Sequence, residues 1–521
     1  MANVLLICLD NQAYGPNVRI LSAIAKRDGH QAYNLFFHKP SPSYQNINPE
    51  TPEELSGFVK LLDDLSIDVV GITLMTHEYY RAIRLADLAR RQGRHVLMGG
   101  IHPTVRPREC LEHADAVCIA DAEGVFSTYL DALDDDRGPD ARRLPSFVLP
   151  DEDPEAVRSS GRIYIEHDLD SVPFPDYSLE NSYYGSGDGI RPMSWAAFKR
   201  LNTWEGGYYR LLSSRGCLYH CSYCMNNFFW RHYGEGYLRR RSVANCITEL
   251  ELAQKNMPFI RGVNIQDDSF FMGSDEWIDD FVDNYKKRID LPFVCRLIPA
   301  YTTEERLAKL SSAGLIHVEV GLQTGSRRMA HNVYQRFQEN ENFLEVDEML
   351  TKYGVTKTYD TLVDNIYETP EDILATLEVI GALERPFYIG AYSLTPFPGT
   401  EYYEKVVADG YLDRMADAYN SPLYATDPNG YYTPKTLRYL IEASPYIPRK
   451  LLAYCKNHWR SNLVNWLAPR LMKWRNLITG LINWGRVKAP GFLQFGLYLS
   501  SFWSKLRYRL FGSSSKQQAH N

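Results

Sequence analysis

The chain has 521 residues, of which 45% are hydrophobic and 23% charged, a composition typical of a globular protein with two or three domains. Its nine cysteines do not suggest a disulfide scaffold, and the first ten residues lack a signal peptide's basic segment, so we expect a cytoplasmic protein. The net charge of −7 is uneven: residues 443–521 hold 13 Lys/Arg and no acid, which leaves 44 basic against 64 acidic side chains in residues 1–442. The acidic body is a poor candidate for binding nucleic acid, whereas the basic end suits an anionic surface.

The first 135 residues alternate short apolar runs with helical patterns. Helical spacing covers residues 19–26 and 80–92, and strands are expected at 4–9, 68–74, 95–100 and 116–120. This alternation predicts an α/β domain with a Rossmann-like, doubly wound parallel sheet, whose ligands bind at the carboxyl ends of the strands. Residues 136–205 are expected to be a linker, rich in Asp, Arg, Pro and Ser to residue 162 and followed by a proline-bearing connector.

A second α/β series covers residues 206–420. Its six expected strands are 209–213, 262–266, 293–297, 317–321, 356–363 and 390–394. Strands separated by helices in this number predict a partial, open (β/α)6 barrel with its site at the strand carboxyl ends. Residues 421–521 are expected to form a helical extension.

Three cysteines on one short loop, Cys217, Cys221 and Cys224, have the spacing C-x3-C-x2-C. Three thiolates can hold three irons of a [4Fe–4S] cluster and leave the fourth iron open, whereas clusters that only carry electrons usually have four cysteine ligands. A zinc loop is the alternative, but zinc favours paired C-x2-C units and needs a fourth ligand, which His220 could supply. The remaining cysteines, such as Cys246, are expected to be buried apolar residues, so no second cluster is expected.

The cysteine loop, with Tyr223 just before its last cysteine, resembles that of the radical SAM enzymes, whose open iron binds S-adenosylmethionine (SAM). The resemblance implies that Tyr223 contacts SAM. The resemblance extends over residues 160–412. It implies that Asp267 and Asp268 pair with the methionine ammonium, although either could instead cap the following helix. Arg296 would meet the SAM carboxylate or, equally, form a structural ion pair.

Three further segments bear on this resemblance. Residues 319–326 resemble the family's fourth-strand segment, where Gln323 and Ser326 would approach SAM or substrate. Residues 395–400 match the sixth-strand turn, in which proline and glycine fix a tight loop. Residues 359–372 occupy the place of the family's G-x-P-G-E-T stretch but lack its first glycine and proline, which leaves the roles at that strand open.

The loop after the first strand, Asp10-Asn-Gln12-Ala-Tyr-Gly15, matches the spacing of the D-x-H-x-x-G motif of cobalamin-binding domains. Gln12 replaces the histidine that can ligate cobalt, and an amide is a poor cobalt ligand. Residues 70–76 and 99–104 resemble the later cobalamin loops of cobalamin-dependent radical SAM enzymes, which often depart from the histidine motif; a plain α/β domain with glycine turns is the alternative. His77 and His102 are expected to be loop or interface residues rather than metal ligands. The cobalamin contacts that the resemblance implies are Asp10, Gln12, Gly15, Thr73, Leu74, Gly99, Gly100 and His102.

The basic tail carries five tryptophans and apolar residues at helical spacing. Its longest uncharged stretch, 489–504, has 16 residues, fewer than the roughly 20 that a membrane span needs, so interfacial helices are favoured. A helical cap on the acidic body is the alternative. A nucleic-acid role is not expected, because no known binding module accompanies the charge.

The resemblance implies a cobalamin-dependent radical SAM C-methyltransferase with three cofactors: a [4Fe–4S] cluster, SAM and cobalamin. In that family a 5′-deoxyadenosyl radical abstracts hydrogen from an unactivated carbon, which then receives a methyl group from methylcobalamin. A porphyrin-type cyclase or rearrangement enzyme and a corrin- or cluster-based sensor are the alternatives. Expected partners are a small-molecule or lipophilic substrate, an electron donor of the flavodoxin or ferredoxin type and, if the tail binds lipid, the cytoplasmic membrane face. The sequence assigns no residue to proton or hydrogen transfer.

Overall fold

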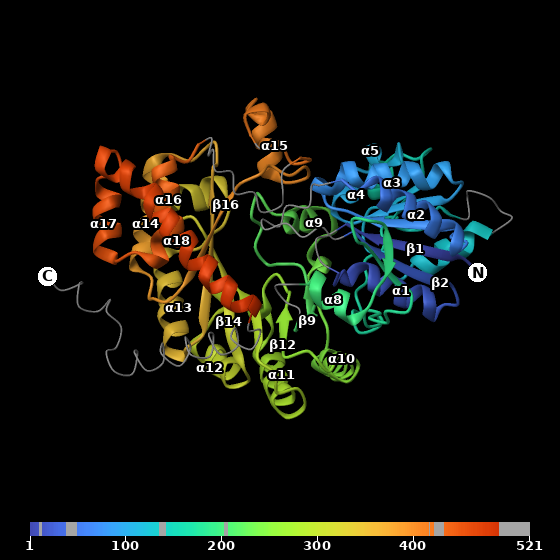
Figure 1. Cartoon of the computed structure of the whole chain (residues 1–521), viewed down its shortest axis with the longest axis horizontal. Helices are drawn as coiled ribbons and strands as arrows, with labels where there is room; N and C mark the ends of the chain where they lie inside the picture. The colour runs from blue at the N-terminus through green and yellow to red at the C-terminus, as the bar shows by residue number, and fades with distance from the viewer. Residues whose placement is uncertain are drawn as a thin grey trace. The chain divides into compact units, whose positions relative to one another are not determined.

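The structure, a computed structural model, describes residues 1–9, 13–37, 49–134, 142–202, 207–415, 417–420 and 432–488 (Figure 1). The chain divides into two compact units. The first comprises Met1–Gly207, Phe228–Arg241 and Thr395–Tyr424, and the second comprises Tyr208–Asn227, Ser242–Leu394 and Ala425–Asn521.

An eight-stranded sheet in the order β6-β5-β4-β3-β1-β2-β7-β8 forms the first unit. Its five central strands are parallel to one another, namely β1 (Asn3–Cys8), β2 (Gln31–Phe36), β3 (Val69–Thr73), β4 (His95–Gly99) and β5 (Ala116–Cys118). The order β2-β1-β3-β4-β5 is that of flavodoxin-like doubly wound folds, which bind ligands where the chain leaves β1 and β3. The expected Rossmann-like sheet is confirmed.

Helices cover both faces of this sheet, which is why its central strands are continuous apolar runs. One face carries α1 (Pro16–Arg27), and the other carries α2 (Pro52–Asp64) and α3 (Tyr79–Arg91) (Figure 1). Five of the six β1 residues are buried. A capping box fixes the start of α2, because the Thr51 hydroxyl accepts the N–H of Glu54 while the Glu54 carboxylate accepts the N–H of Thr51.

Residues 142–202 belong to the first sheet rather than to a linker. β6 (Phe147–Val148) pairs with β5, β7 (Ser182–Gly185) pairs with β2, and β8 (Ile190–Pro192) pairs with β7. Two short helices, α7 (Pro154–Ser159) and α8 (Trp195–Leu201), complete the segment. Strands of two to four residues are too short to show a hydrophobic period, so composition alone gave the wrong interpretation.

Six strands in sequence order form the sheet of the second unit, which is open and fits the expected partial barrel. All five neighbouring pairs are parallel, and the strands are β9 (Tyr208–Leu211), β12 (Gly262–Ile265), β13 (Phe293–Leu297), β14 (Leu315–Gln323), β15 (Thr356–Val363) and β16 (Tyr388–Ser393). The connecting helices are α10 (Val243–Asn256), α11 (Asp275–Arg288), α12 (Glu304–Ser312), α13 (Asn340–Tyr353) and α14 (Pro370–Ala382).

Side chains alternate between two environments along these strands. On β14 and β15, Val318, Val320, Leu322, Tyr359 and Val363 are buried against the helices. The residues between them stay partly exposed on the opposite face, which we call the inner face. Ligands of a parallel barrel bind at the carboxyl end of this face.

Three helices follow near the carboxyl end of the chain: α16 (Lys435–Ala443), α17 (Arg449–Asn457) and α18 (Asn462–Lys488). Leu437, Leu440 and Ile441 of α16 are fully buried, so this helix is part of the second unit's core. No described helix is long and apolar enough to cross a membrane. The amphipathic pattern expected over residues 492–510 lies outside the described residues.

Candidate functional site

The cysteine loop lies between β10 (Ser214–Arg215) and α9 (Met225–Tyr233). It is fastened at its centre, where the N–H and hydroxyl of Ser222 donate to the carbonyls of Tyr334 (2.9 Å) and Val333 (2.6 Å). Each cysteine sulfur accepts one N–H donor, in the pairs Tyr219 N to Cys217 (3.4 Å), Arg336 Nη1 to Cys221 (3.7 Å) and Asn226 Nδ2 to Cys224 (3.8 Å).

Asp267, expected as a SAM contact, is fully buried and binds the two serines that precede the cysteine loop. Its Oδ1 accepts the N–H groups of Ser213 (2.7 Å) and Ser214 (3.1 Å), and its Oδ2 accepts both hydroxyls. Four hydrogen bonds occupy both oxygens, so this carboxylate fixes the chain that enters the loop and does not face a ligand.

Asp268, in contrast, is exposed and remains the candidate for the methionine ammonium. The surrounding protein raises the pKa of its carboxyl by desolvation, against the opposing effects of the Asn226 amide and Arg296. Arg296 forms the ion pair that was the alternative to a SAM contact: its Nε lies 3.0 Å from Oε2 of Glu319. The same guanidinium donates to the carbonyl of Gln266 at 3.3 Å.

Gln323 and Ser326 follow each other at the end of β14 but differ in role. Gln323 has a left-handed backbone (φ 62°), where the pairing with β15 is irregular, and a Cβ at Gly321 would lie 2.4 Å from its Nε2. Ser326 is 6% exposed, and its hydroxyl donates to Asp372 in the first turn of α14. Although burial alone would raise the pKa of Asp372, hydrogen bonds from Arg328, Ser326 and Thr369 lower it to about 2. Ser326 therefore has a structural partner.

Arg336 is a site residue that sequence reasoning missed. It is 8% exposed, its guanidinium stacks 4.6 Å from the centre of the Tyr219 ring, and its Nη2 donates to the carbonyl of Gly321 (3.1 Å). It lies 115 residues from Cys221, the ligand it contacts, and no motif marks it. Tyr223 forms a hydrogen bond with the sulfur of Cys221, and its expected contact with SAM stays a prediction.

In the first unit, the loop after β1 is held at its far end by a buried arginine. Arg19 donates to the carbonyls of Ala13 (2.9 Å), Tyr14 (2.7 Å) and Asp176 (2.8 Å). Gly15 precedes α1 with φ 40°, and a Cβ there would lie 2.8 Å from the Phe36 ring, so only glycine fits. Asp10 and Gln12 lie outside the described residues, and their cobalamin contacts stay predictions.

Small residues line the ends of β3 and β4. The Thr73 hydroxyl accepts the Asn17 amide (3.0 Å), and the N–H of Leu74 donates to the carbonyl of Gly99 (3.1 Å). Gly100 is exposed with φ 103°, and a Cβ there would lie 2.9 Å from the carbonyl oxygen of Leu74. The backbone at this edge is therefore accessible at Gly99 and Gly100, whereas the Leu74 side chain is buried.

Two histidines follow the strands at this edge, and one of them has both ring nitrogens against polar groups. His102 is fully buried, with Nδ1 3.2 Å from the Thr76 hydroxyl and Nε2 2.9 Å from the Glu109 carboxylate. Both ring nitrogens face polar groups and the residue lies in the short helix α4 (Ile101–Val105) rather than in a loop, so His102 lines no open cobalamin surface. Burial lowers the pKa of His77 to about 4, which keeps its ring neutral.

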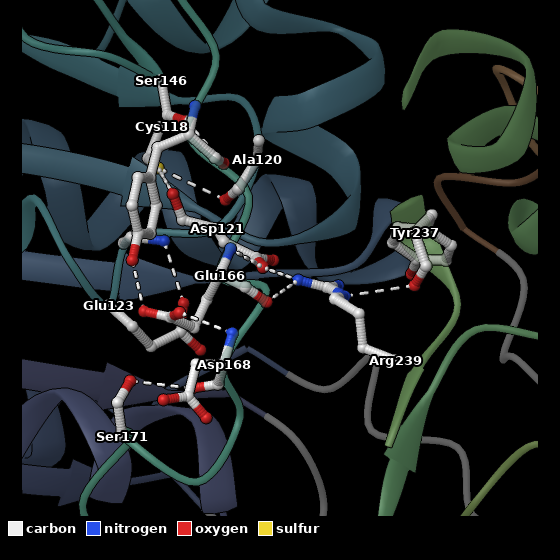
Figure 2. Close-up of polar contacts among 12 residues, drawn as sticks. Cys118, Ala120, Asp121, Glu123, Ser146, Glu166, Asp168, Ser171, Tyr237 and Arg239 are labelled. Atoms are coloured by element: carbon white, nitrogen blue, oxygen red, sulfur yellow. Dashed lines mark hydrogen bonds and ion pairs between the residues drawn. The ribbon is translucent and has the colours of Figure 1, made fainter. Parts of the chain in front are cut away.

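A cluster of polar side chains follows β5 and includes Arg239, which lies 118 residues after Asp121 in the sequence (Figure 2). Arg239, on β11 (Arg239–Arg240), pairs with the Asp121 carboxylate and donates to the carbonyl of Glu166 (2.6 Å). The N–H of Glu166 donates to the same carboxylate at 3.1 Å. Burial raises the pKa of the nearby Cys118 thiol to about 12, so it stays protonated and unreactive. This cluster has no sequence motif, and its role is to anchor residues 228–241 in the first unit.

Two family models match the chain at these places. Residues 211–380 match the radical SAM superfamily, and residues 2–130 match the B12 binding domain. The chain is a radical SAM enzyme with a B12 binding domain.

Curated relatives and solved structures resemble most of this radical SAM enzyme. An uncharacterized methyltransferase of Pyrococcus horikoshii is 25% identical over 368 residues, 69% of this chain and 74% of the relative. The bacteriochlorophyllide d C-8(2)-methyltransferase of Chlorobaculum tepidum is 24% identical over 368 residues, 68% of this chain and 71% of the relative. Among solved structures, the radical SAM methyltransferase TsrM from Kitasatospora setae, with tryptophan and a SAM analogue bound, has a TM-score of 0.62 at 15% identity and covers 87% of this chain and 89% of its own. The structural likeness supports the same fold.

The cofactors of the enzyme are a [4Fe–4S] cluster, SAM and cobalamin. The thiols are suited to binding the cluster. Burial raises the pKa of Cys217 to about 11 and that of Cys224 to about 12, and binding to iron would deprotonate both thiols in spite of this burial. N–H donors to each sulfur are the expected surroundings of such a cluster. No three Cys, His, Asp or Glu side chains among the described residues surround a single ion; a cubane instead places its thiolates on three separate irons.

The strand ends of the first unit also fit their cofactor. Thr73, Gly99 and Gly100 are partly or fully exposed at the edge where a flavodoxin-like sheet binds its ligand, and their small side chains let a flat ring approach the backbone. His102 offers no free imidazole there, because both of its ring nitrogens face polar groups.

Proposed function

We propose that this enzyme methylates an unactivated carbon of a small-molecule substrate. The observation that carries the proposal is that relatives matching more than two thirds of this chain, which has both cofactor domains, are named methyltransferases. When bound, the cofactors supply a carbon-centred radical from SAM and a transferable methyl group.

The chain's own residues hold and orient these groups. Cys217, Cys221 and Cys224 would bind three irons, with Arg336 and Asn226 donating to two of the sulfurs. In the first unit, Thr73, Gly99 and Gly100 would let the corrin approach the strand ends, and Gln12, in place of the motif's histidine, would offer the cobalt no imidazole.

An anaerobic assay tests the proposal. The reconstituted protein is incubated with SAM, cobalamin and a reduced flavodoxin-type electron donor, and 5′-deoxyadenosine and S-adenosylhomocysteine are both measured. Methylation yields the two products together, whereas cyclisation yields 5′-deoxyadenosine without coupled S-adenosylhomocysteine, and a sensor yields neither. Cys221→Ala should abolish both products, while Cys246→Ala, at a buried cysteine of α10, should retain them.

We further propose that α18 contacts an anionic membrane surface. Leu463, Trp466, Trp474 and Leu477 are each more than half exposed on one face of this helix. Arg470 stacks 3.7 Å from the centre of the Trp466 ring, and residues 443–521 contain no acid to neutralise this face. Tryptophan and basic residues on one exposed face are typical of interfacial helices.

Co-sedimentation of the full chain with vesicles tests this contact. Phosphatidylglycerol-containing vesicles should retain the wild type, and vesicles of phosphatidylcholine alone should not. A double variant, Trp466→Ser with Trp474→Ser, should lose the binding, whereas Leu252→Ser, at an exposed apolar residue of α10, should keep it. Equal sedimentation of the double variant and the wild type would exclude the membrane role.

A further inference from the structure

The inner face of the second unit carries a charged group in which only Arg296 was expected to contact a cofactor. Arg296 on β13, Glu319 on β14, Asp360 on β15 and Tyr392 on β16 occupy four adjacent strands, and each stands at a partly exposed position between buried neighbours. We call these four residues the inner-face quartet. Charged side chains are costly inside a barrel unless they have a partner or a ligand, so their presence calls for a role.

The quartet is connected through its side chains. Nε of Arg296 lies 3.0 Å from Oε2 of Glu319, and these side chains are 36% and 49% exposed. The Asp360 carboxyl accepts a hydrogen bond from Tyr392 and lies close enough to Glu319 and Arg296 for both to shift its pKa. A ligand on the inner face would therefore meet two carboxyl groups side by side.

Glycines flank Asp360 on both neighbouring strands. Gly321 on β14 and Gly390 on β16 are its register partners. A Cβ at Gly321 would lie 2.4 Å from Nε2 of Gln323, and a Cβ at Gly390 would lie 2.5 Å from the hydroxyl of Tyr392. The Gln323 amide and the Tyr392 hydroxyl thus fold over the two glycines toward Asp360. Gln323 has a left-handed backbone (φ 62°), which costs about 1 kcal/mol or more and is held by its surroundings.

The charges of the quartet do not balance. One guanidinium serves two carboxyl groups, and its closest contact is with Glu319. Burial, and then the nearby Glu319, raise the pKa of Asp360 to about 7. A second cation beside Asp360 would remove this conflict, and no Lys or Arg of the described residues forms an ion pair with it.

We propose that the inner-face quartet binds the ammonium group of an amine-bearing substrate, which the carboxylates of Asp360 and Glu319 receive. The inference rests on the proposed function, because it names the substrate class of that site. Carboxylate–ammonium hydrogen bonds are about twice as strong as neutral ones, so the pair would select an amine over an alcohol or acid of the same shape. SAM also carries an ammonium, and the test has to separate the two sources.

The test uses the reconstituted protein without reductant, so that it does not depend on turnover. Binding of n-butylamine, n-butanol and butyrate, which differ only in the head group, is measured by saturation-transfer NMR. We expect n-butylamine to bind and the other two not to bind. Asp360→Asn and Glu319→Gln should each weaken the affinity for n-butylamine by about tenfold. Glu305→Gln, at an exposed carboxylate of α12, should leave this affinity unchanged.

A second arm measures SAM affinity for the same variants by equilibrium dialysis. We expect the dissociation constant for SAM to change by less than about twofold. If the variants lose affinity for SAM and for n-butylamine together, the quartet binds SAM and the proposal is wrong. Equal n-butylamine binding by the wild type and both variants would also overturn the proposal. Iron content checks that each variant is folded, and Glu319→Gln provides the result if Asp360→Asn fails to fold. Absence of methyl transfer in the assay above would leave these binding results intact.

Discussion

Asp267→Ala is expected to deplete the protein of iron without removing an iron ligand. The wild-type carboxylate accepts the N–H and hydroxyl of both Ser213 and Ser214. Hydrogen bonds to a charged group contribute about 1.5–3 kcal/mol each, and a buried, unpaired N–H costs about 1–3 kcal/mol. The four bonds share one carboxylate and do not add, so a loss of about 3 kcal/mol is a conservative value. This is a large part of a typical folding free energy of about 5–15 kcal/mol.

The damage should be local, because these serines lie directly before the cysteine loop. We expect Asp267→Ala to hold less than half of the wild-type iron and sulfide after reconstitution and to melt at a lower temperature. Asp267→Asn should be milder, since its oxygen can accept both N–H groups while its amide donates to the hydroxyls. Asp268→Asn is the matched control: this exposed neighbour should keep full iron content and lose SAM affinity. Wild-type iron in Asp267→Ala would refute the reasoning.

Three other predictions follow from named contacts. Arg336→Met removes a cation from the Cys221 sulfur and should make the cluster harder to reduce by about 60 mV, measured by redox titration, whereas Arg336→Lys should shift the potential less. Because the folded pKa of Asp360 is raised to about 7, its stabilisation is present below pH 4 and lost as the pH rises through 7; Asp360→Asn should therefore melt above the wild type at pH 8 but not at pH 4. Asp347→Asn leaves the ammonium of Lys357, which is 2% exposed, buried without its ion-pair partner and should cost about 3–5 kcal/mol. The double variant Asp347→Leu with Lys357→Met should recover only part of this loss in thermal denaturation, because the Tyr359 hydroxyl and the Glu384 N–H also lose their acceptor.

The sequence predicted both sheets and the cysteine loop because each has a strong local signal. Buried parallel strands are continuous apolar runs, and three cysteines in eight residues are specific by their spacing. The roles of Asp267 and Asp268 could not be separated in this way, since adjacent carboxylates look alike until one is seen to be buried. Arg336 escaped for another reason: only the fold brings it to Cys221, so no local pattern records the contact.

Strained backbone gathers at the ends of strands in both units. Gly15 follows β1 with φ 40° and Gly100 follows β4 with φ 103°, while Gln323 ends β14 with φ 62° and Asp364 follows β15 with φ 60°. A residue other than glycine in this region costs about 1–2 kcal/mol, and surrounding contacts have to hold it there. Asp364 is held by Arg438, by the Ser393 hydroxyl (2.6 Å) and by the Thr433 N–H (3.3 Å). Each turn redirects the chain sharply as it leaves a parallel strand, at the edge where both folds bind their ligands. Gln323 and Asp364 are therefore strained at the edge where a parallel barrel brings loop backbone close to its ligand, which favours a functional role for these two turns.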